Sequence, residues 1–381
     1  MDFTWSEEQL AFKAAVIEFA RQRLNHDIVE RDRDGRFSRD LWQECAKFGI
    51  QGLPFAEEYG GGGADILTTM LTMEGLGYGC RDNGLIFGIN AQMWSVQMPI
   101  FSFGTPEQKK KYLPGLCNGT LIGAHGMSEP DSGSDAFSLR TRAVRCGDGY
   151  VLNGAKTFVT NAPMCDLAVI FATVDPARKM LGVTGFIVEN GTPGFSVSRH
   201  IEKMGLRTSP MAEVVLQDCH VPESSRLGKE GMGARIFSDS MEWERSCILG
   251  SYVGTMQRLL ERCVEHARDR KQFGQPIGSF QSVANRIVDM KLRLETARLL
   301  LYEVAWLKKT GKSAVMEAAL AKLYLSECFV QSGLDAIRTM GGYGYTAEYE
   351  VERDFRDAVG GTLYSGTSDI QRNIIARLLG L

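Results

Sequence analysis

The sequence predicts an α+β fold with an N-terminal helical domain, a middle antiparallel β-domain and a C-terminal four-helix bundle. Apolar residues recur at helical spacing up to about residue 120 and again from about residue 233. Between these zones short apolar runs alternate with turn residues, and no long helix separates them. A chain of 381 residues is long enough for about two or three packed units. We therefore expect domains over residues 1–120, 121–232 and 233–381.

The first domain is helical in pattern and interrupted once. Phe12, Val16 and Phe19 share one face of a helix close to the N-terminus. The stretch PFAEEYGGGGAD at 54–65 carries a proline and four consecutive glycines, which predicts a loop. Helical spacing resumes in LTTMLTMEGLGYG at 67–79.

The middle domain consists of short strands. The apolar or alternating runs lie at 150–154, 167–174, 183–190, 195–200 and 212–218. Gly, Asn, Asp and Pro separate them at hairpin distances, which favours an antiparallel barrel or sandwich over a doubly wound parallel sheet.

The last domain is strongly helical. One apolar seam runs from Cys247 to Ala267, a second helix is expected over 280–309 and a third over 313–340. Glycines follow the second and third helices, and a fourth helix begins near Thr367. Long helices with short connections predict a four-helix bundle.

Composition excludes several classes of protein. There are 43 basic and 46 acidic residues, a net charge of −3, which leaves no surplus to bind a nucleic-acid backbone. The nine cysteines form no CxxC pair, and the five histidines have no metal spacing. We therefore expect no metal site and no disulfide framework, only buried thiols in a reducing compartment.

The N-terminal residues lack a basic region followed by an apolar core, so they do not resemble a signal peptide. No apolar run reaches the roughly 18 residues that a membrane helix requires. The expected location is the cytoplasm, without membrane contact.

The most informative stretch is IGAHGMSEPDSGSDAFSLRTRA at 122–143. Its glycines and serines would present backbone N–H groups and hydroxyls to a planar heteroaromatic ring or an anion, although a tight turn has the same composition. Two other glycine clusters, GLGYG at 75–79 and GKEGMG at 228–233, lack the βαβ context of a dinucleotide loop. The second cluster is interpreted as a flexible connector.

Three motifs together give a specific resemblance. SEPDSGSD at 128–135, ARDRKQFG at 267–274 and GTSDIQR at 366–372 occur in the order found in the acyl-CoA dehydrogenase flavoprotein family, which the chain resembles from residue 54 to its C-terminus. The order of helices, β-domain and bundle is that of the family. The resemblance implies FAD as cofactor and α,β-dehydrogenation of an acyl thioester, with hydride transfer to flavin N5.

The resemblance also assigns the cofactor-binding residues. They are Met127, Ser128, Phe158, Thr160, Arg270, Phe273, Gln281, Arg338, Gly341, Gly342, Thr367 and Asp369. Ser128 stands where Thr is usual, and Phe158 stands where an aromatic ring packs on the flavin. Arg270 matches an arginine that reaches the FAD of a neighbouring subunit, whereas Arg338 replaces a more usual Gln. This assignment implies at least a dimer, and family precedent implies a homotetramer.

The catalytic base departs from the commonest pattern. Many members read YEGTS, but this chain reads YSGTS, and the Ser365 hydroxyl cannot remove a proton from carbon. Other branches of the family place a Glu directly before an Arg on a bundle helix, and SMEWERSC at 240–247 places Glu244 and Arg245 there. We expect Glu244, at the start of an apolar helix, to be a desolvated base, while the Ser365 N–H stabilises the enolate-like oxygen. A surface salt bridge is the alternative role for Glu244.

The substrate is narrowed by further resemblance. Ser134, Glu242 and Arg245 match positions near the substrate, the first two beside its pantetheine arm. Strings such as NAPMCDLAVIFAT at 161–173 resemble the prolyl-carrier-protein dehydrogenase and oxidase branch of specialised metabolism. We favour an acyl or aminoacyl group on an acyl or peptidyl carrier protein over free acyl-CoA. A flavin monooxygenase, a nitroalkane-oxidase-like enzyme and a non-catalytic carrier-protein binder remain open, and the electron acceptor is an electron-transfer flavoprotein or oxygen.

Overall fold

The described part of the first zone forms seven helices. The structure is a computed structural model that describes residues 4–381. The helices are α1 (Glu7–Arg23), α2 (Ile28–Asp34), α3 (Arg39–Lys47), α4 (Ile66–Gly79), α5 (Asn83–Gln92), α6 (Met98–Phe103) and α7 (Pro106–Cys117). A π-helical turn, η2 (Met93–Gln97), joins α5 to α6. The predicted loop at 54–65 is confirmed, with only the short 3₁₀ turn η1 (Glu57–Tyr59) inside it.

Local side chains fix where these helices begin. Ser6, Asp65 and Thr105 each accept a hydrogen bond from a backbone N–H in the first turn of α1, α4 and α7. At Ser6 and Thr105 a glutamine three residues later completes a reciprocal capping box.

The middle zone forms one eight-stranded sheet. Its strands are β1 (Gly123–Gly126), β2 (Arg142–Cys146), β3 (Gly149–Thr160), β4 (Leu167–Thr173), β5 (Val183–Glu189), β6 (Phe195–His200), β7 (Met211–Pro222) and β8 (Arg226–Leu227). The order is β6-β7-β3-β2-β4-β5-β8, and β1 pairs with β4. Three 3₁₀ turns, η3 (Ala162–Met164), η4 (Pro176–Gly182) and η5 (Glu223–Ser225), connect strands.

The sheet is mixed, so the prediction of a purely antiparallel sheet is wrong in one respect. β1 runs parallel to β4, with Gly123 opposite Leu167, and β2 makes one parallel bridge to β4. The hairpin formed by β2 and β3 lies between β1 and β4 in sequence, which gives the chain the long crossover that a parallel pair requires. Sequence spacing detects neighbouring hairpins but carries no information on this long-range pairing.

The third zone contains the long helices. Its elements are α8 (Gly233–Cys247), α9 (Gly250–Asp269), the hairpin β9 (Lys271–Gln272) and β10 (Gln275–Pro276), η6 (Ile277–Ser279), α10 (Gln281–Lys309), α11 (Val315–Met340), α12 (Gly342–Tyr345), η7 (Ala347–Tyr349), α13 (Val351–Gly360) and α14 (Ser368–Leu378). The predicted fold class is confirmed. Two details differ from the prediction. The sequence pattern does not predict α13, and the apolar seam expected from Cys247 to Ala267 is divided between α8 and α9.

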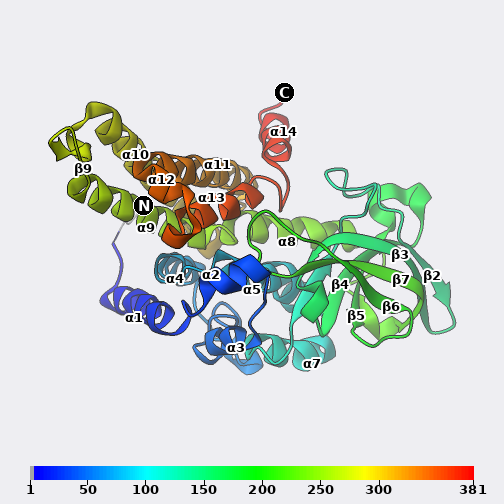
Figure 1. The fold of residues 1–381 in the computed structure, drawn as a ribbon. Helices are drawn as coiled ribbons and strands as arrows, with labels where there is room; N and C mark the ends of the chain where they lie inside the picture. Colours follow the sequence, from blue (N-terminus) through cyan, green and yellow to red (C-terminus); the bar gives the residue numbers. More distant parts are fainter. Residues whose placement is uncertain (1–3) are drawn as a thin grey trace.

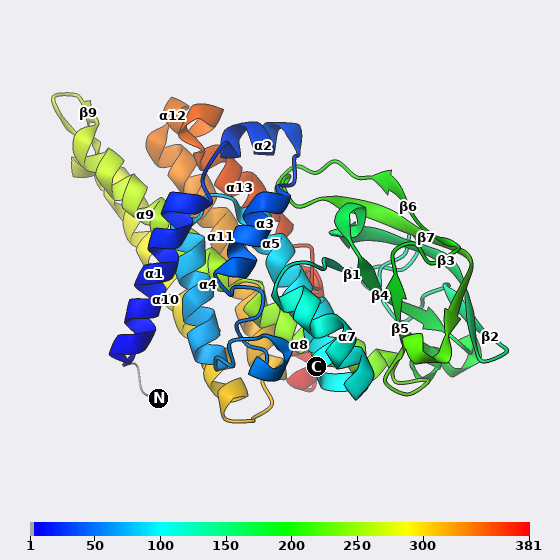
Figure 2. The same cartoon turned by 90° about the horizontal axis from the view of Figure 1, so that it is seen from below.

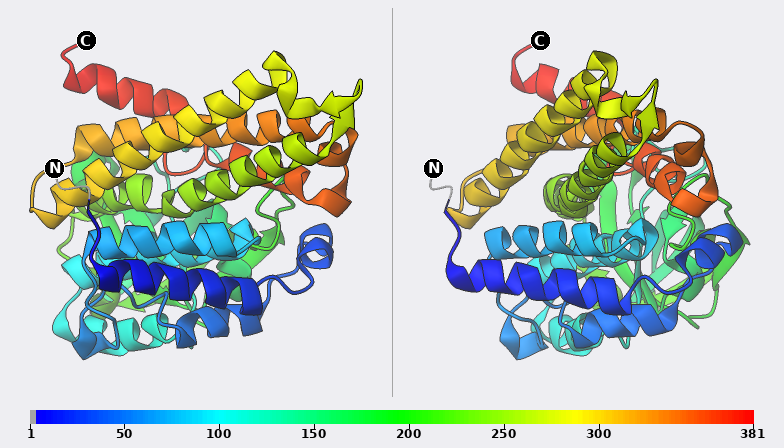
Figure 3. Two further views of the ribbon diagram at one scale, coloured as in Figure 1. Left: turned by 90° about the vertical axis from the view of Figure 1, so that its left-hand side faces the viewer. Right: turned by 60° about the vertical axis from the view of Figure 1, so that its left-hand side comes forward.

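The N-terminal and C-terminal helices share one core. Figure 3 shows α1, α4 and the long helices α9 to α11 in successive near-parallel layers. A Cβ at Gly77 on α4 would lie 1.9 Å from the Ser251 carbonyl oxygen, and one at Gly254 on α9 would lie 1.9 Å from that of Glu74. The two glycines let α4 and α9 approach backbone to backbone. The β-domain packs beside this helical body, with α8 reaching towards it (Figures 1 and 2).

The cysteines form no disulfide in the described residues. All nine are free thiols, and eight are buried as expected. Cys146, at the end of β2, is exposed, so the expectation of buried thiols fails there. A hairpin turn that follows it directly at Gly147 leaves this residue at the surface.

Candidate active site

The predicted base is buried, but at the opposite end of its helix from where the sequence suggested. Glu244 lies three residues before the C-terminal end of α8, not at the start of a helix, and only 8% of its surface is exposed. The break falls at Ile248 and Leu249, whose backbones stay in the right-handed helical region, so neither glycine nor proline marks it before Gly250. A helix C-terminus disfavours a negative charge, which makes Glu244 a stronger base.

Two hydroxyls hold the Glu244 carboxylate. Ser95 Oγ donates to Oε2 and Ser365 Oγ donates to Oε1, each at 2.5 Å. Ser95 lies in the π-helical turn η2, while Ser365 has φ +54° in the loop before α14. Three distant segments therefore meet at one carboxylate, and its plane is fixed by hydrogen bonds at both oxygens.

Ser95 is a residue that sequence reasoning missed. It lies in AQMWSVQMP, where nothing distinguishes a helix from a π-turn. π-turns in helices often occur at functional sites, because the extra residue redirects one side chain. The hydroxyl of Ser365 was also assigned no role towards Glu244, since the motif resemblance concerned only its position before GTS.

Burial and charge act in opposite directions on Glu244. Burial raises its pKa, whereas the Ser365 and Ser95 hydroxyls and the cations of Arg245 and Lys322 lower it. The net effect is upward, so the carboxylate is a better proton acceptor than one in water.

Two cations near Glu244 lack hydrogen-bond partners. Lys322 of α11 is fully buried with an unpartnered ammonium, and Arg245 Nε is likewise unpartnered. Burial, then the neighbouring Arg245 guanidinium, lowers the pKa of Lys322 to about 8, while Glu244 opposes the shift. Arg245, which is predicted to contact the substrate, thus keeps an N–H donor without a partner.

Glu242 lies on a different face of α8 from Glu244. Two residues along a helix correspond to a rotation of about 200°. Glu242 accepts a hydrogen bond from Lys308 Nζ at 2.8 Å, and that ammonium also lies 3.9 Å from the centre of the Trp243 ring. The structure therefore does not bring Glu242 to the base, and its contact with a pantetheine arm stays a prediction.

The four residues predicted to contact the flavin ring come together at the ends of β1 and β3. Met127 and Ser128 follow β1, and the Thr157 N–H of β3 donates to the Ser128 carbonyl at 2.9 Å. Phe158 has φ +55° and is 63% exposed, while Thr160 ends β3. An exposed aromatic side chain in a strained backbone conformation beside free polar groups fits a planar ring that would cover it.

A buried ion pair between Lys156 and Glu129 stabilises the connection at 127–141, between β1 and β2. Lys156 Nζ donates to Glu129 Oε1 at 2.7 Å and to the Met127 carbonyl at 3.2 Å. Glu129 in turn accepts bonds from the N–H groups of Arg140 and Thr141. The pair ties the two ends of the 127–141 connection, which carries Ser134 at its exposed side.

The start of α14 offers polar groups to a cofactor. Thr367 Oγ1 accepts from the Ile370 N–H, and Ser368 Oγ is buried without a partner. An orphaned buried hydroxyl at a helix N-terminus fits the polar part of a nucleotide cofactor. Asp369, in the same turn, has an exposed side chain.

The remaining predicted cofactor residues lie at the other end of the long helices. Arg270, Phe273 and Gln281 lie on or beside the β9–β10 hairpin, where Arg270 stacks over the Tyr343 ring at 5.6 Å. At the same place Arg338 lies in the last turn of α11, Gly341 caps that helix and Gly342 begins α12. Figure 1 shows this hairpin at the far end from the β-domain. About 28 Å of helix separates Lys322, beside Glu244, from Gly341.

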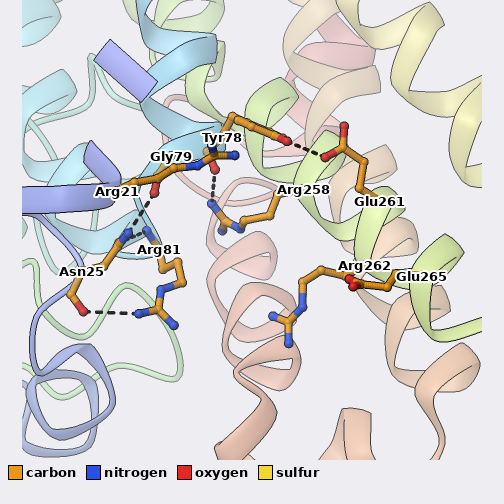
Figure 4. A pocket seen from close by; sticks show the side chains of 9 residues that line it. All are labelled: Arg21, Asn25, Tyr78, Gly79, Arg81, Arg258, Glu261, Arg262 and Glu265. Carbon is orange, nitrogen blue, oxygen red and sulfur yellow. Dashed lines mark hydrogen bonds between the residues drawn. The ribbon is translucent and has the colours of Figure 1, made fainter. Parts of the chain in front are cut away.

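A separate pocket of about 400 Å³ lies between α1, α4 and α9 (Figure 4). Arg258 donates there to the carbonyls of Gly77 and Cys80 at the C-terminal end of α4, and Tyr78 donates to Glu261. These groups satisfy one another's hydrogen bonds, and no predicted site residue lines the pocket.

Within residues 4–381, no cluster of His, Cys, Asp or Glu could hold a metal, and no helix is long and apolar enough to span a membrane.

Comparison with known proteins identifies the family. The N-terminal, middle and C-terminal domains of acyl-CoA dehydrogenase match residues 6–120, 124–219 and 231–380. The chain belongs to the acyl-CoA dehydrogenase family, which confirms the resemblance found in its motifs.

Particular relatives are more specific. An L-prolyl-[peptidyl-carrier protein] dehydrogenase from a Serratia species is 43% identical over 100% of this chain and 99% of its own length. The crystal structure of the prolyl acyl carrier protein oxidase AnaB has a TM-score of 0.98 at 52% identity, covering 99% of this chain and all of its own. PigA with FAD and proline also has a TM-score of 0.98, at 43% identity over both full chains.

Proposed function

We propose that this protein is an FAD-dependent dehydrogenase or oxidase that acts on a prolyl thioester of a carrier protein. The observation that carries the proposal is the buried Glu244 carboxylate, held between the hydroxyls of Ser95 and Ser365. The relatives named above act on, or bind, proline-derived substrates, and one is described with FAD. This support favours the carrier-linked substrate over free acyl-CoA.

Each protein group has a definite task in this reaction. Glu244 removes the proton from the carbon next to the thioester carbonyl, and the two serine hydroxyls keep its carboxylate aimed at that carbon. The Ser365 N–H stabilises the charge that develops on the carbonyl oxygen. FAD, when bound, supplies the acceptor for the hydride. Met127, Ser128, Phe158 and Thr160 orient the ring and exclude water, and Thr367 and Ser368 hold polar groups of the cofactor.

A second subunit completes the cofactor site in this proposal. The predicted cofactor residues at the hairpin end lie too far along the bundle to contact an FAD that touches Phe158 of the same chain. They are Arg270, Phe273, Gln281, Arg338, Gly341 and Gly342. Phe273 is 93% exposed at the tip of the hairpin, as expected of a side chain that packs against a neighbour. We therefore infer at least a dimer, with a homotetramer as the expected assembly.

Anaerobic reduction of the flavin tests the function. The holoenzyme should be bleached by prolyl-loaded carrier protein, and Glu244→Gln should slow this step by about a thousandfold, because an amide cannot accept the proton. Retention of bound FAD in the variant separates loss of the base from loss of the cofactor. Undiminished bleaching would remove Glu244 as the base, and bleaching by butyryl-CoA alone would reverse the choice of substrate.

The acceptor is tested with the same reduced enzyme. Rapid reoxidation by dissolved oxygen would define an oxidase. Slow reoxidation that an added electron-transfer flavoprotein accelerates would define a dehydrogenase.

A further inference from the structure

We propose that the N-terminal end of α8 and the adjoining η4 turn form the surface on which an acidic carrier protein docks. We call it the basic rim and define it as Arg178, Lys179, Met180, Leu181, Lys229 and Arg235. The inference rests on the proposed function and names where its macromolecular substrate binds.

Exposed apolar and basic side chains occur together in η4. Met180 is 48% exposed and Leu181 65% exposed, and Arg178 and Lys179 beside them are also exposed. Lys179 has φ +50°, so the short helical turn is kinked at this residue. Apolar side chains ringed by cations are typical of a surface that a charged protein partner covers.

The start of α8 lies directly against η4. A Cβ at Gly231 would lie 2.7 Å from the Leu181 carbonyl oxygen and 3.9 Å from the Arg178 guanidinium. The Gly231 N–H donates to Thr184 at 3.0 Å, which fixes the connection against β5. Lys229 in this connection and Arg235 in the first turn of α8 are both exposed, so they extend the same surface.

The rim has a surplus of positive charge. Its four cations form no ion pair in the described part of the chain. Glu230, between them, is already bonded to Tyr150 and Arg145, and Asp175 accepts from the Ala177 N–H. Asp239, one turn beyond Arg235, faces Lys308 as well as Arg235. A chain with net charge −3 therefore presents a local cationic surface, which complements an acidic carrier and its phosphodiester.

The same helix leads from the rim to the base. Gly233, Phe237 and Glu244 lie on one face of α8, and Gly233 and Glu244 are about 16 Å apart along it. Phe237 packs edge to face with Phe137 of the 127–141 connection, at 5.8 Å between ring centres. A carrier protein seated on the rim would thus lie about 16 Å, measured along α8, from the carboxylate on which its arm must act. The exposed Met180 and Leu181 favour a protein partner, since a free nucleotide would leave them uncovered.

Charge reversal tests the rim in the holoenzyme. The double variant Arg178→Glu with Lys179→Glu should raise KM for prolyl-loaded carrier protein about tenfold at low salt and flatten its salt dependence. The variant Leu181→Ser should raise the same KM without changing the salt dependence. Reversal of Arg36 and Lys110, which are exposed elsewhere, provides the matched control.

A small substrate separates docking from chemistry. Prolyl-pantetheine thioester lacks the carrier, so kcat/KM for it should stay within about twofold of the unmodified enzyme in all rim variants. An unchanged KM for the carrier would overturn the rim, as would an equal loss for prolyl-CoA, which would make the rim a nucleotide-binding surface. If neither prolyl substrate bleached the unmodified enzyme, the proposed function itself would fail.

Discussion

At the scale of the residue, the site depends on one carboxylate whose proton affinity is set by its neighbours. Burial in α8 makes the charged form of Glu244 unfavourable, while Ser95, Ser365, Arg245 and Lys322 favour it. A base for a carbon acid needs this balance, because it must be ionised and yet poorly solvated. Arg245 follows Glu244 on α8, but Ser95, Ser365 and Lys322 come from three other segments, so the balance exists only in the folded chain.

The variant Ser95→Ala should shift the acid limb of the flavin-reduction rate upward by about one pH unit. The Ser95 hydroxyl donates to the ionised carboxylate, so its removal raises the pKa of Glu244 further. As the pH falls, the variant should therefore lose its flavin-reduction rate at a higher pH than the unmodified enzyme does. Stopped-flow reduction at several pH values measures the limb.

The control for this variant is Ser246→Ala. The Ser246 hydroxyl donates to helix carbonyls and does not contact Glu244. An equal shift in both variants, or none in Ser95→Ala, would contradict the assigned role of Ser95.

At the scale of the element, close helix packing places the segments that carry these neighbours. α4 and α9 cross with glycines at their contact, and α9 is joined to α8 by only two residues. The position of the Glu244 end of α8 is therefore coupled to the α4–α9 contact. Interiors of proteins tolerate little added volume at such a crossing.

The variant Gly254→Ala should lower the free energy of unfolding by about 3 kcal/mol or prevent folding, because a Cβ would overlap the Glu74 carbonyl. Gly133→Ala is the matched change, since a Cβ there meets nothing within 4 Å. Thermal denaturation of both variants measures the difference. Similar melting temperatures would show that α4 and α9 can separate without cost.

At the scale of the whole molecule, the predicted cofactor residues divide into two groups. One lies at the ends of β1 and β3 and the start of α14, and the other lies at the β9–β10 hairpin, which Figure 1 shows at the far end from the β-domain. The first group includes Phe158, and the second includes Phe273. In the proposed function a second subunit brings the two groups to one cofactor, so assembly and cofactor binding are linked. Because the two are linked, a change at the hairpin should weaken both subunit assembly and FAD binding.

The variant Phe273→Asp should dissociate the assembly and weaken FAD binding by about tenfold, since it puts a charge into the inferred subunit contact. Sedimentation velocity measures the assembly, and flavin fluorescence measures the retained FAD. Lys312→Asp, in the exposed turn between α10 and α11, is the control. An intact assembly in Phe273→Asp would place the subunit contact elsewhere.

Much of the architecture was available from the sequence. Helical and strand periodicities located the three zones, because these signals act between residues close in the chain. The motifs identified the family and singled out Glu244 as the carboxylate of interest. The expected burial of Glu244 is confirmed, although it was argued from a place at the start of a helix and the residue lies near the end of α8.

The tertiary structure decided what surrounds that carboxylate. Ser95 reaches Glu244 from 149 positions away and Ser365 from 121, and no local pattern encodes such distances. The parallel pairing of β1 with β4, the break before α9 and the juxtaposition of η4 with α8 have the same origin. Local interactions determine which elements form, whereas packing over the whole chain determines which side chains share a low-dielectric site and thus what chemistry they perform.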